Sequence, residues 1–212
     1  MQVTPTIWLS LVSTSVVISL TPGAGAINTM ANSLSVGWRR SFWGVLGQQL
    51  ALMAYLIIVA AGVGVFVANS PIMFNTIRYL GAAYLVYLGI RQLLARPTAS
   101  TAPDKTEMEA VGASVGALIL RGFWVNILNP KAVVFFLAFV PQFIKPDLPL
   151  VPQYTLLAVT LVAVDVLVMW GFFATAAKPF RGFAATPRGQ RIIGLVFGVL
   201  FVLMGILLLF LH

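Results

Sequence analysis

The sequence predicts an all-α membrane protein with six transmembrane helices, arranged as two inverted three-helix repeats. The chain of 212 residues is 60% hydrophobic and only 8% charged, whereas a soluble domain carries about 25% charged residues. Its apolar runs suffice for six crossings of about 20 residues each. The first and fourth runs are interrupted at prolines, Pro22 and Pro130. Breaks at corresponding places in two halves of a chain are typical of a transporter's binding site.

The expected helices follow the apolar runs in order. They cover about 5–28, 42–67, 72–94, 115–143, 151–177 and 192–211. Loops are expected at Arg39 and Arg40, in the proline-rich stretch 141–152, and in the basic stretch 178–191. We expect residues 1–212 to form a single integral membrane domain, with repeat 1 at about 1–96, a cytoplasmic linker at about 97–112 and repeat 2 at about 113–212.

The lysines and arginines outside the apolar runs lie mainly on one side of this expected topology. Lys145 and Arg78 fall on the other side. Because basic residues collect on the cytoplasmic side, we expect both termini in the periplasm and the two halves to enter the membrane from opposite sides. The net charge of +8 then reflects membrane orientation rather than a nucleic-acid partner. The cytoplasmic set is Arg39, Arg40, Arg91, Arg96, Lys105, Arg121, Lys178, Arg181, Arg188 and Arg191.

The composition excludes several kinds of chemistry. The chain has no cysteine, and its one histidine is His212. Thiol redox chemistry and cysteine metal sites are therefore impossible, and we predict no metal, no cofactor and no enzyme activity. A thiol-transfer or electron-carrier membrane protein is disfavoured for the same reason. A channel stays open as an alternative and would show transport independent of a proton gradient.

The first break is Thr21-Pro22-Gly23-Ala24-Gly25. It combines a helix-breaking proline with glycines that adopt unusual backbone angles. Unwinding here would free backbone amides and carbonyls in a protein-lined cavity. The half-helix that follows would direct its positive end at a substrate carboxylate. The alternative is a simple kink, because proline and glycine are common in membrane helices.

The second break, Asn129-Pro130-Lys131, is the stronger signal. A cation at membrane depth costs about 3 kcal/mol by insertion scales. Apolar residues flank Lys131 on both sides, so we expect it in the cavity, either binding an anion or pairing with Asp165. The alternative is a lysine that snorkels to the membrane interface.

Asp165 is the only acid in any expected membrane segment. Ionisable residues there are usually functional, and acids often relay protons. We predict that Asp165 couples transport to proton movement, with a structural salt bridge to Lys131 as the alternative.

Gly194-x-x-x-Gly198 is a close-packing motif that fits either an internal contact or a homodimer. Side chains that can line a polar path or bond helix to helix are Asn28, Gln48, Gln49, Asn126 and Gln142.

Three segments resemble the signatures of a known family, the lysine-exporter superfamily of bacterial amino-acid exporters. They match its first, third and fourth helices, in order, and the resemblance covers essentially the whole chain. The Val164–Met169 segment and the Gly25–Met30 run resemble its homoserine and homoserine-lactone exporter branch. The three segments are Ser19–Met30, Leu80–Gly89 and Asn126–Ala132 running on to Phe143.

The resemblance implies six helices, a location in the bacterial inner membrane, and proton-driven efflux of homoserine, homoserine lactone or threonine. Export of a branched-chain or basic amino acid, or proton-independent facilitation, is the alternative. The expected partners are the amino-acid substrate, protons and the lipid bilayer. The predicted substrate-binding residues are Thr21, Pro22, Gly23, Gly25, Asn28, Gln48, Asn126, Asn129, Pro130 and Lys131, with Asp165 for proton coupling.

Overall fold

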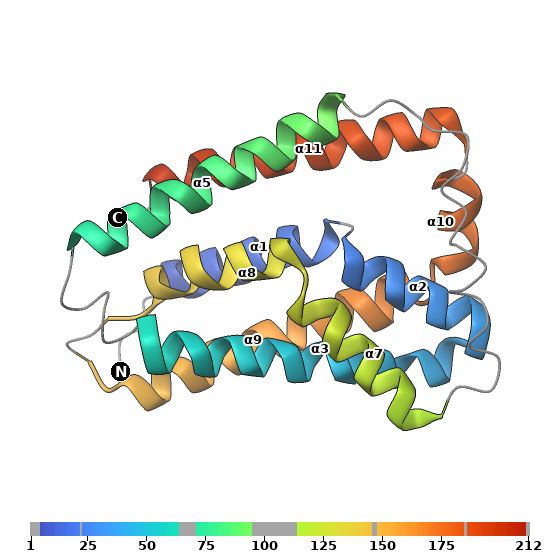
Figure 1. Ribbon diagram of the computed structural model, residues 1–212, viewed down its shortest axis with the longest axis horizontal. Coiled ribbons are helices and arrows are strands. Elements are labelled where there is room, and N and C mark those ends of the chain that lie inside the picture. Colours follow the sequence, from blue (N-terminus) through green and yellow to red (C-terminus); the bar gives the residue numbers. More distant parts are fainter. Residues whose placement is uncertain are drawn as a thin grey trace.

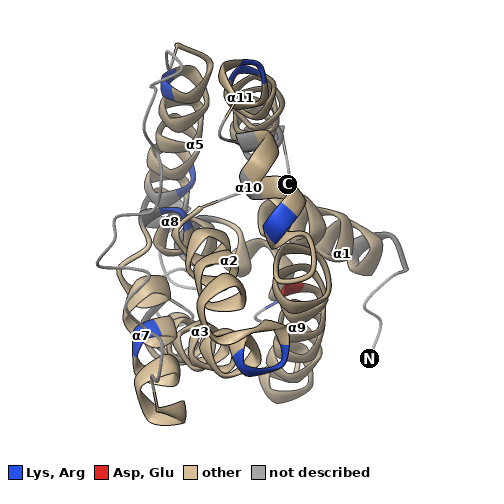
Figure 2. Cartoon of the chain, turned by 90° about the vertical axis from the view of Figure 1, so that its right-hand side faces the viewer, with Lys and Arg blue, Asp and Glu red and all other residues tan. Residues whose placement is uncertain are grey.

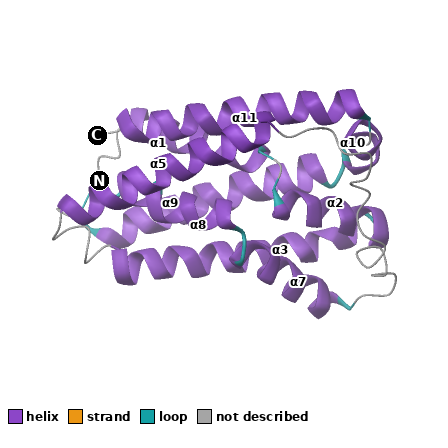
Figure 3. Cartoon of the chain, turned by 45° about the horizontal axis from the view of Figure 1, so that its top comes forward, coloured by secondary structure: helices purple, strands orange, loops and turns teal. Residues whose placement is uncertain are grey.

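The computed structural model describes residues 5–21, 23–63, 71–94, 114–145, 148–184 and 186–210. All of its elements are helical, which confirms the all-α prediction for this part of the chain (Figure 3). Pro22 and the linker expected at 97–112 lie outside the described residues. The elements are α1 (Pro5–Leu20), α2 (Ala24–Val36), α3 (Trp38–Ile58), η1 (Val59–Val63), α5 (Pro71–Leu94), α7 (Val115–Ile127), α8 (Pro130–Ala138), η2 (Val140–Phe143), α9 (Leu150–Val166), η3 (Leu167–Phe173), α10 (Ala177–Ala184) and α11 (Pro187–Phe210).

Several of these helices are built to cross a bilayer. Three stretches in the described residues are long and apolar enough, namely Trp38–Ala61, Leu150–Phe173 and Pro187–Ile206. The bent pair Trp8–Leu20 and Ala24–Val36, with 58° between its halves, makes a fourth if it counts as one span. Helices satisfy their own backbone hydrogen bonds, which is what a lipid environment demands. The chain is therefore a multi-pass membrane protein.

Both expected helix breaks are present. The first separates α1 from α2 between Leu20 and Ala24. The second separates α7 from α8 at Leu128 and Asn129, and Pro130 occupies the first position of α8. Proline is well suited to that position because its missing N–H would have no intrahelical partner there. Pro130 thus begins a new half-helix instead of bending a continuous one.

Two predicted loops are wrong. Arg39 and Arg40 lie in the first turn of α3, because Gly37 alone, with φ +84°, turns the chain out of α2. The basic stretch 178–191 is largely helical, formed by α10 and the start of α11. Its prolines, Pro179 and Pro187, fall in the first turns of these helices, where proline is tolerated.

Helices α5 and α11 pack side by side as a layer above the other helices (Figure 1). Glycines allow their backbones to approach closely. A Cβ added at Gly89 would lie 2.7 Å from the Gly198 carbonyl oxygen, and one at Gly194 would lie 3.1 Å from the Gln92 carbonyl oxygen. The Gly194-x-x-x-Gly198 motif therefore makes an internal contact with α5.

The lower layer contains α3 and α7, which are also joined by glycines. A Cβ added at Gly122 would collide with the Gly44 carbonyl, and one at Gly47 would collide with the Ile119 carbonyl. This pair leaves no room for side chains between the two backbones. Helices α1, α2, α8 and α9 complete this layer. The apolar core around Phe135, Phe136 and Phe139 lies among α1, α3, α5, α8, α9 and α11.

The N-terminal start of α1 and the C-terminal end of α11 lie at the same end of the molecule (Figure 1). Lysines and arginines gather at the opposite end, where α3 and α7 begin (Figure 2). Among the described residues, Asp165 is the one acid. It lies near the end of α9, where η3 continues the helix, and not at either end of the molecule. The charges that flank the helices are thus nearly all cationic and concentrated at one end.

Candidate functional site

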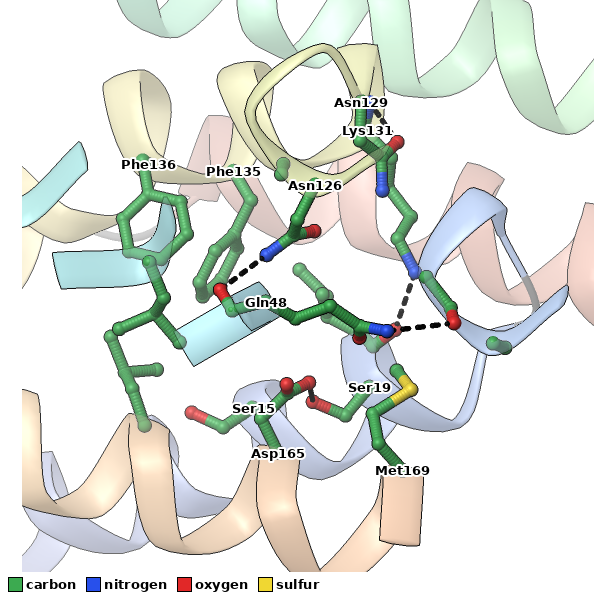
Figure 4. A pocket seen from close by; sticks show the side chains of 16 residues that line it. Ser15, Ser19, Gln48, Asn126, Asn129, Lys131, Phe135, Phe136, Asp165 and Met169 are labelled. Carbon is green, nitrogen blue, oxygen red and sulfur yellow. Dashed lines mark hydrogen bonds between the residues drawn. The ribbon is translucent and has the colours of Figure 1, made fainter. Parts of the chain in front are cut away.

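A polar cavity lies where the two broken helices meet (Figure 4). The centres of water-sized molecules can occupy about 50 Å³ of it, which is room for about four waters at 10–15 Å³ each. An apolar pocket of this size would be unremarkable inside a membrane protein, but this one is lined by a cation, an acid and several amides. Its lining comprises Ser15, Ile18, Ser19, Gly25, Ala26, Gln48, Leu52, Asn126, Asn129, Lys131, Ala132, Phe135, Phe136, Leu161, Asp165 and Met169.

Lys131 reaches from α8 to the broken end of α1. Its ammonium donates hydrogen bonds to the carbonyl oxygens of Ile18, at 2.9 Å, and Thr21, at 2.7 Å. Carbonyls at a helix C-terminus lack intrahelical partners and carry partial negative charge, so a lysine there stabilises the helix end. The cation of the second break therefore caps the first half-helix of the first break.

Asp165 enters the cavity from α9, on the opposite side from Lys131 (Figure 4). The Ser19 hydroxyl donates to its Oδ1 at 2.8 Å, and Gln49 Nε2 donates to its Oδ2 at 2.7 Å. Both carboxyl oxygens of Asp165 thus have a neutral side-chain donor. The alternative of a salt bridge between Asp165 and Lys131 is not formed in this arrangement: Lys131 donates to backbone carbonyls, and Asp165 accepts from two neutral side chains.

Gln48 connects α3 to the start of α2. Its side-chain nitrogen donates to the Gly25 carbonyl at 3.1 Å and to the Thr29 hydroxyl at 3.0 Å. The backbone carbonyl oxygen of Gln48 in turn accepts from Asn126 Nδ2 at 3.0 Å. A Cβ added at Gly25 would lie 3.0 Å from Gln48 Oε1, which is closer than ordinary van der Waals contact. Glycine thus gives this amide access to the α2 backbone.

The N-termini of α2 and α8 both lie beside the cavity but are capped differently. The Asn129 side chain accepts a hydrogen bond from the Lys131 backbone N–H at 3.1 Å, which caps α8. Gly23 occupies the equivalent position before α2 and has no side chain to cap it. The first amides of α2, which include those of Gly25 and Ala26 at the cavity wall, are therefore left for another acceptor.

The structure brings most of the predicted site residues together. Gly25, Gln48, Asn126, Asn129, Lys131 and Asp165 line the cavity. Thr21, which supplies a carbonyl to Lys131, and Gly23, which precedes α2, are not among the lining residues. Pro130 begins α8 beside them. Asn28 is buried one turn further along α2, and Pro22 lies outside the described residues.

Two polar lining residues were missed, Ser15 and Ser19 on α1. Serine is common in membrane helices, where its hydroxyl bonds back to the helix carbonyls, as Ser15 does to Leu11 at 2.6 Å. Such residues give a weak signal on their own. Their spacing of four residues, which places them on one face just before the break, is the signal that identifies them.

These features define a multi-pass membrane protein with a polar cavity between two broken helices. The chain belongs to the LysE type translocator family, whose model matches residues 16–211. Members of this family are transporters and not enzymes, and the predicted family is confirmed.

The relatives of this protein align with nearly the whole of its chain. It is 39% identical to a homoserine/homoserine lactone efflux protein of Salmonella typhi, over 95% of each chain. It is 37% identical to an uncharacterized membrane protein of Vibrio cholerae serotype O1, over 95% of this chain and 96% of the relative. No solved structure matches the chain.

Proposed function

We propose that this protein exports small amino acids and their derivatives from the cytoplasm, with homoserine and homoserine lactone as the first substrates to test and threonine next. The observation that carries the proposal is the cavity, in which Lys131 and Asp165 lie on opposite walls together with neutral amides. Its size suits a solute that displaces about four waters. The printed name of the Salmonella typhi relative, a homoserine/homoserine lactone efflux protein, supports the same substrate class.

The proposed binding mode follows from which polar groups are already occupied. Lys131 donates to the end of α1, so it is not the first choice for the substrate carboxylate. The uncapped amides at the start of α2 are better placed, because a helix N-terminus favours an anion. Asp165 attracts the substrate ammonium. The lactone lacks a free carboxylate and would depend on Asp165 and the amides of Gln48 and Asn126.

Proton coupling arises in this proposal from competition for Asp165. The carboxylate holds a substrate ammonium only when ionised, and a proton that enters from the opposite side of the membrane releases the substrate. The neutral donors Ser19 and Gln49 can reorient when the carboxyl is protonated, whereas a permanent salt bridge would resist protonation. Export is then driven by protons that move inward.

The same proposal includes the topology. The corresponding breaks in α1–α2 and α7–α8, and the pairing of α5 with α11, fit two inverted repeats of three spans each. The cation-rich end (Figure 2) faces the cytoplasm of a bacterial inner membrane, and both termini face the periplasm. Single cysteines at Arg188, at the cation-rich end, and at Pro149, at the other, test this in the otherwise cysteine-free chain. Labelling of Arg188→Cys instead of Pro149→Cys in intact spheroplasts, by an impermeant reagent, would refute it.

Transport itself is tested with purified protein in proteoliposomes. Counterflow with a panel of labelled amino acids identifies the substrate, and an imposed pH gradient tests coupling. We expect Asp165→Asn to retain some exchange but to lose accumulation driven by the gradient, because an amide cannot release a proton. The matched control is Thr155→Val, a substitution of similar shape at an exposed residue of α9 outside the cavity. Full accumulation by Asp165→Asn would show that Asp165 is structural.

A further inference from the structure

Two buried asparagines on α2 have no hydrogen-bond partner. Asn28 is 4% exposed and Asn32 is 0% exposed, and neither the oxygen nor the nitrogen of either side-chain amide is paired. Buried amides are nearly always hydrogen-bonded, because water would otherwise satisfy them. A pair of unpartnered amides within one helix therefore indicates groups that are satisfied in another arrangement of the protein.

These asparagines continue the polar lining of the cavity along α2. Asn28 and Asn32 are four residues apart and share the helix face of Gly25 and Thr29, both of which Gln48 contacts on α3. One turn further, this face meets Gly44 of α3. A Cβ added at Gly44 would lie 3.7 Å from Asn28 Nδ2 and would collide with Asn32 Nδ2. The amides thus lie between α2 and α3, on the side of the cavity that leads to Gly37.

Both ends of helix α2 have features typical of a hinge. The helix is short, with 13 residues, and a glycine flanks each end, Gly23 without a side-chain cap and Gly37 with φ +84°. Hinges are often small residues at the ends of an element. Helix α3, in contrast, is held against α7 at Gly44 and Gly47, where the two backbones leave no room for a Cβ. If the interface opens, α2 moves and the α3–α7 pair stays together.

We propose that Asn28 and Asn32 line the route by which the substrate passes between the cavity and the Gly37 end of the molecule. The proposal rests on the proposed export function. An amide both donates and accepts hydrogen bonds, so a row of two can contact the carboxylate and the ammonium of a zwitterion in turn. In the arrangement described here α2 lies against α3 and the route is closed. When α2 swings away, substrate and water satisfy the two amides.

The test uses the absence of cysteine from the chain. Asn28→Cys and Asn32→Cys are placed singly in the full chain, in membrane vesicles of known orientation, and treated with a charged, membrane-impermeant methanethiosulfonate reagent. We expect both cysteines to react from the side on which Gly37 lies, and saturating homoserine to abolish the reaction. Thr29→Cys, on the same face, serves as a further reporter if an asparagine variant does not fold.

Two control variants lie on other faces of α2. Ile27 is 50% exposed on the outer surface, and Met30 packs against the apolar cluster around Phe173. Ile27→Cys should not react because lipid covers this outer face in the proposed topology, and Met30→Cys should not react because it is packed against the cluster. Wild-type counterflow is measured in the same vesicles, and its absence would overturn the proposed function. If the wild type exchanges amino acids while no reporter cysteine reacts, or if the controls react equally, the inference about the route alone is overturned.

Discussion

The two helix breaks each contain a proline in the sequence, but they are stabilised differently. At the second break, neutral groups serve both ends. Tyr55 donates to the Ile127 carbonyl at 2.6 Å, and the Asn129 side chain caps α8. At the first break, the end of α1 is held by Lys131 from the other half of the chain, and the start of α2 has no side-chain cap. Each break thus receives one side chain from the other half of the chain, Tyr55 or Lys131, but only the second has a side-chain cap at the start of its following helix, and the first amides of α2 have none.

This difference separates a structural break from one suited to binding. Backbone donors that already have acceptors gain little from a ligand, since binding only exchanges one hydrogen bond for another. Backbone N–H groups that have no acceptor and lie beside a cavity gain a whole hydrogen bond when a ligand binds. The first break is therefore the better site for a substrate carboxylate, even though the lysine and the stronger sequence signal belong to the second.

The largest effect is expected for Lys131→Met. Hydrogen bonds to charged groups are worth about 1.5–3 kcal/mol, and this substitution removes two of them from the end of α1. We expect a clear fall in the unfolding temperature in detergent and loss of counterflow. Lys145→Met, at an exposed lysine, is the control and should change neither. An unaltered unfolding temperature for Lys131→Met would mean that the α1 carbonyls do not need this cation.

The next effect is expected for Asn129→Ala. Loss of a helix N-cap costs about 0.5–2 kcal/mol, so the unfolding temperature should fall, and Asn129→Ser should restore most of it because serine also caps. If alanine and serine are equally destabilising at this position, the asparagine acts through the cavity and not as a cap.

The smallest effect is expected for Tyr55→Phe. It removes one neutral hydrogen bond, from the hydroxyl to the end of α7, and such a bond contributes about 0.5–1.5 kcal/mol. The ring keeps its stacking on Phe136, with centroids 5.1 Å apart. Stability measured by thermal unfolding should fall slightly and counterflow should persist. Loss of exchange in a stable variant would contradict the assignment of the second break to structure.

The sequence predicted the all-helical class, the apolar helical stretches and both breaks because hydropathy and proline act locally. It also located Lys131 and Asp165 in the interior, since a charge within an apolar run has few alternatives. It did not predict the partners of these charges. The acceptors of Lys131 are backbone carbonyls that become available only because α1 ends beside α8, and no residue type at Ile18 or Thr21 signals this. Arg39 and Arg40 were misplaced because a single glycine made the turn for which a longer loop was expected.

The central claim is that the uncapped start of α2 receives the substrate carboxylate, and Gly23 offers the most direct test. Its backbone is extended, with φ −142° and ψ −165°, as an N-cap residue requires. A Cβ there would lie in ordinary contact, 3.5 Å from Lys131 Cε and Nζ. Gly23→Ser would supply the missing cap, whereas Gly23→Ala would add only the methyl group. Counterflow of homoserine and of its lactone is measured for both variants, together with thermal unfolding.

The account predicts that Gly23→Ser unfolds at a higher temperature than Gly23→Ala, by about 1 kcal/mol in stability, and exchanges homoserine much more slowly while still exchanging the lactone. The serine hydroxyl would occupy the amides that the carboxylate needs, and the lactone has no carboxylate to lose. Equal homoserine exchange by the two variants, with the serine variant the more stable, would show that the carboxylate binds elsewhere.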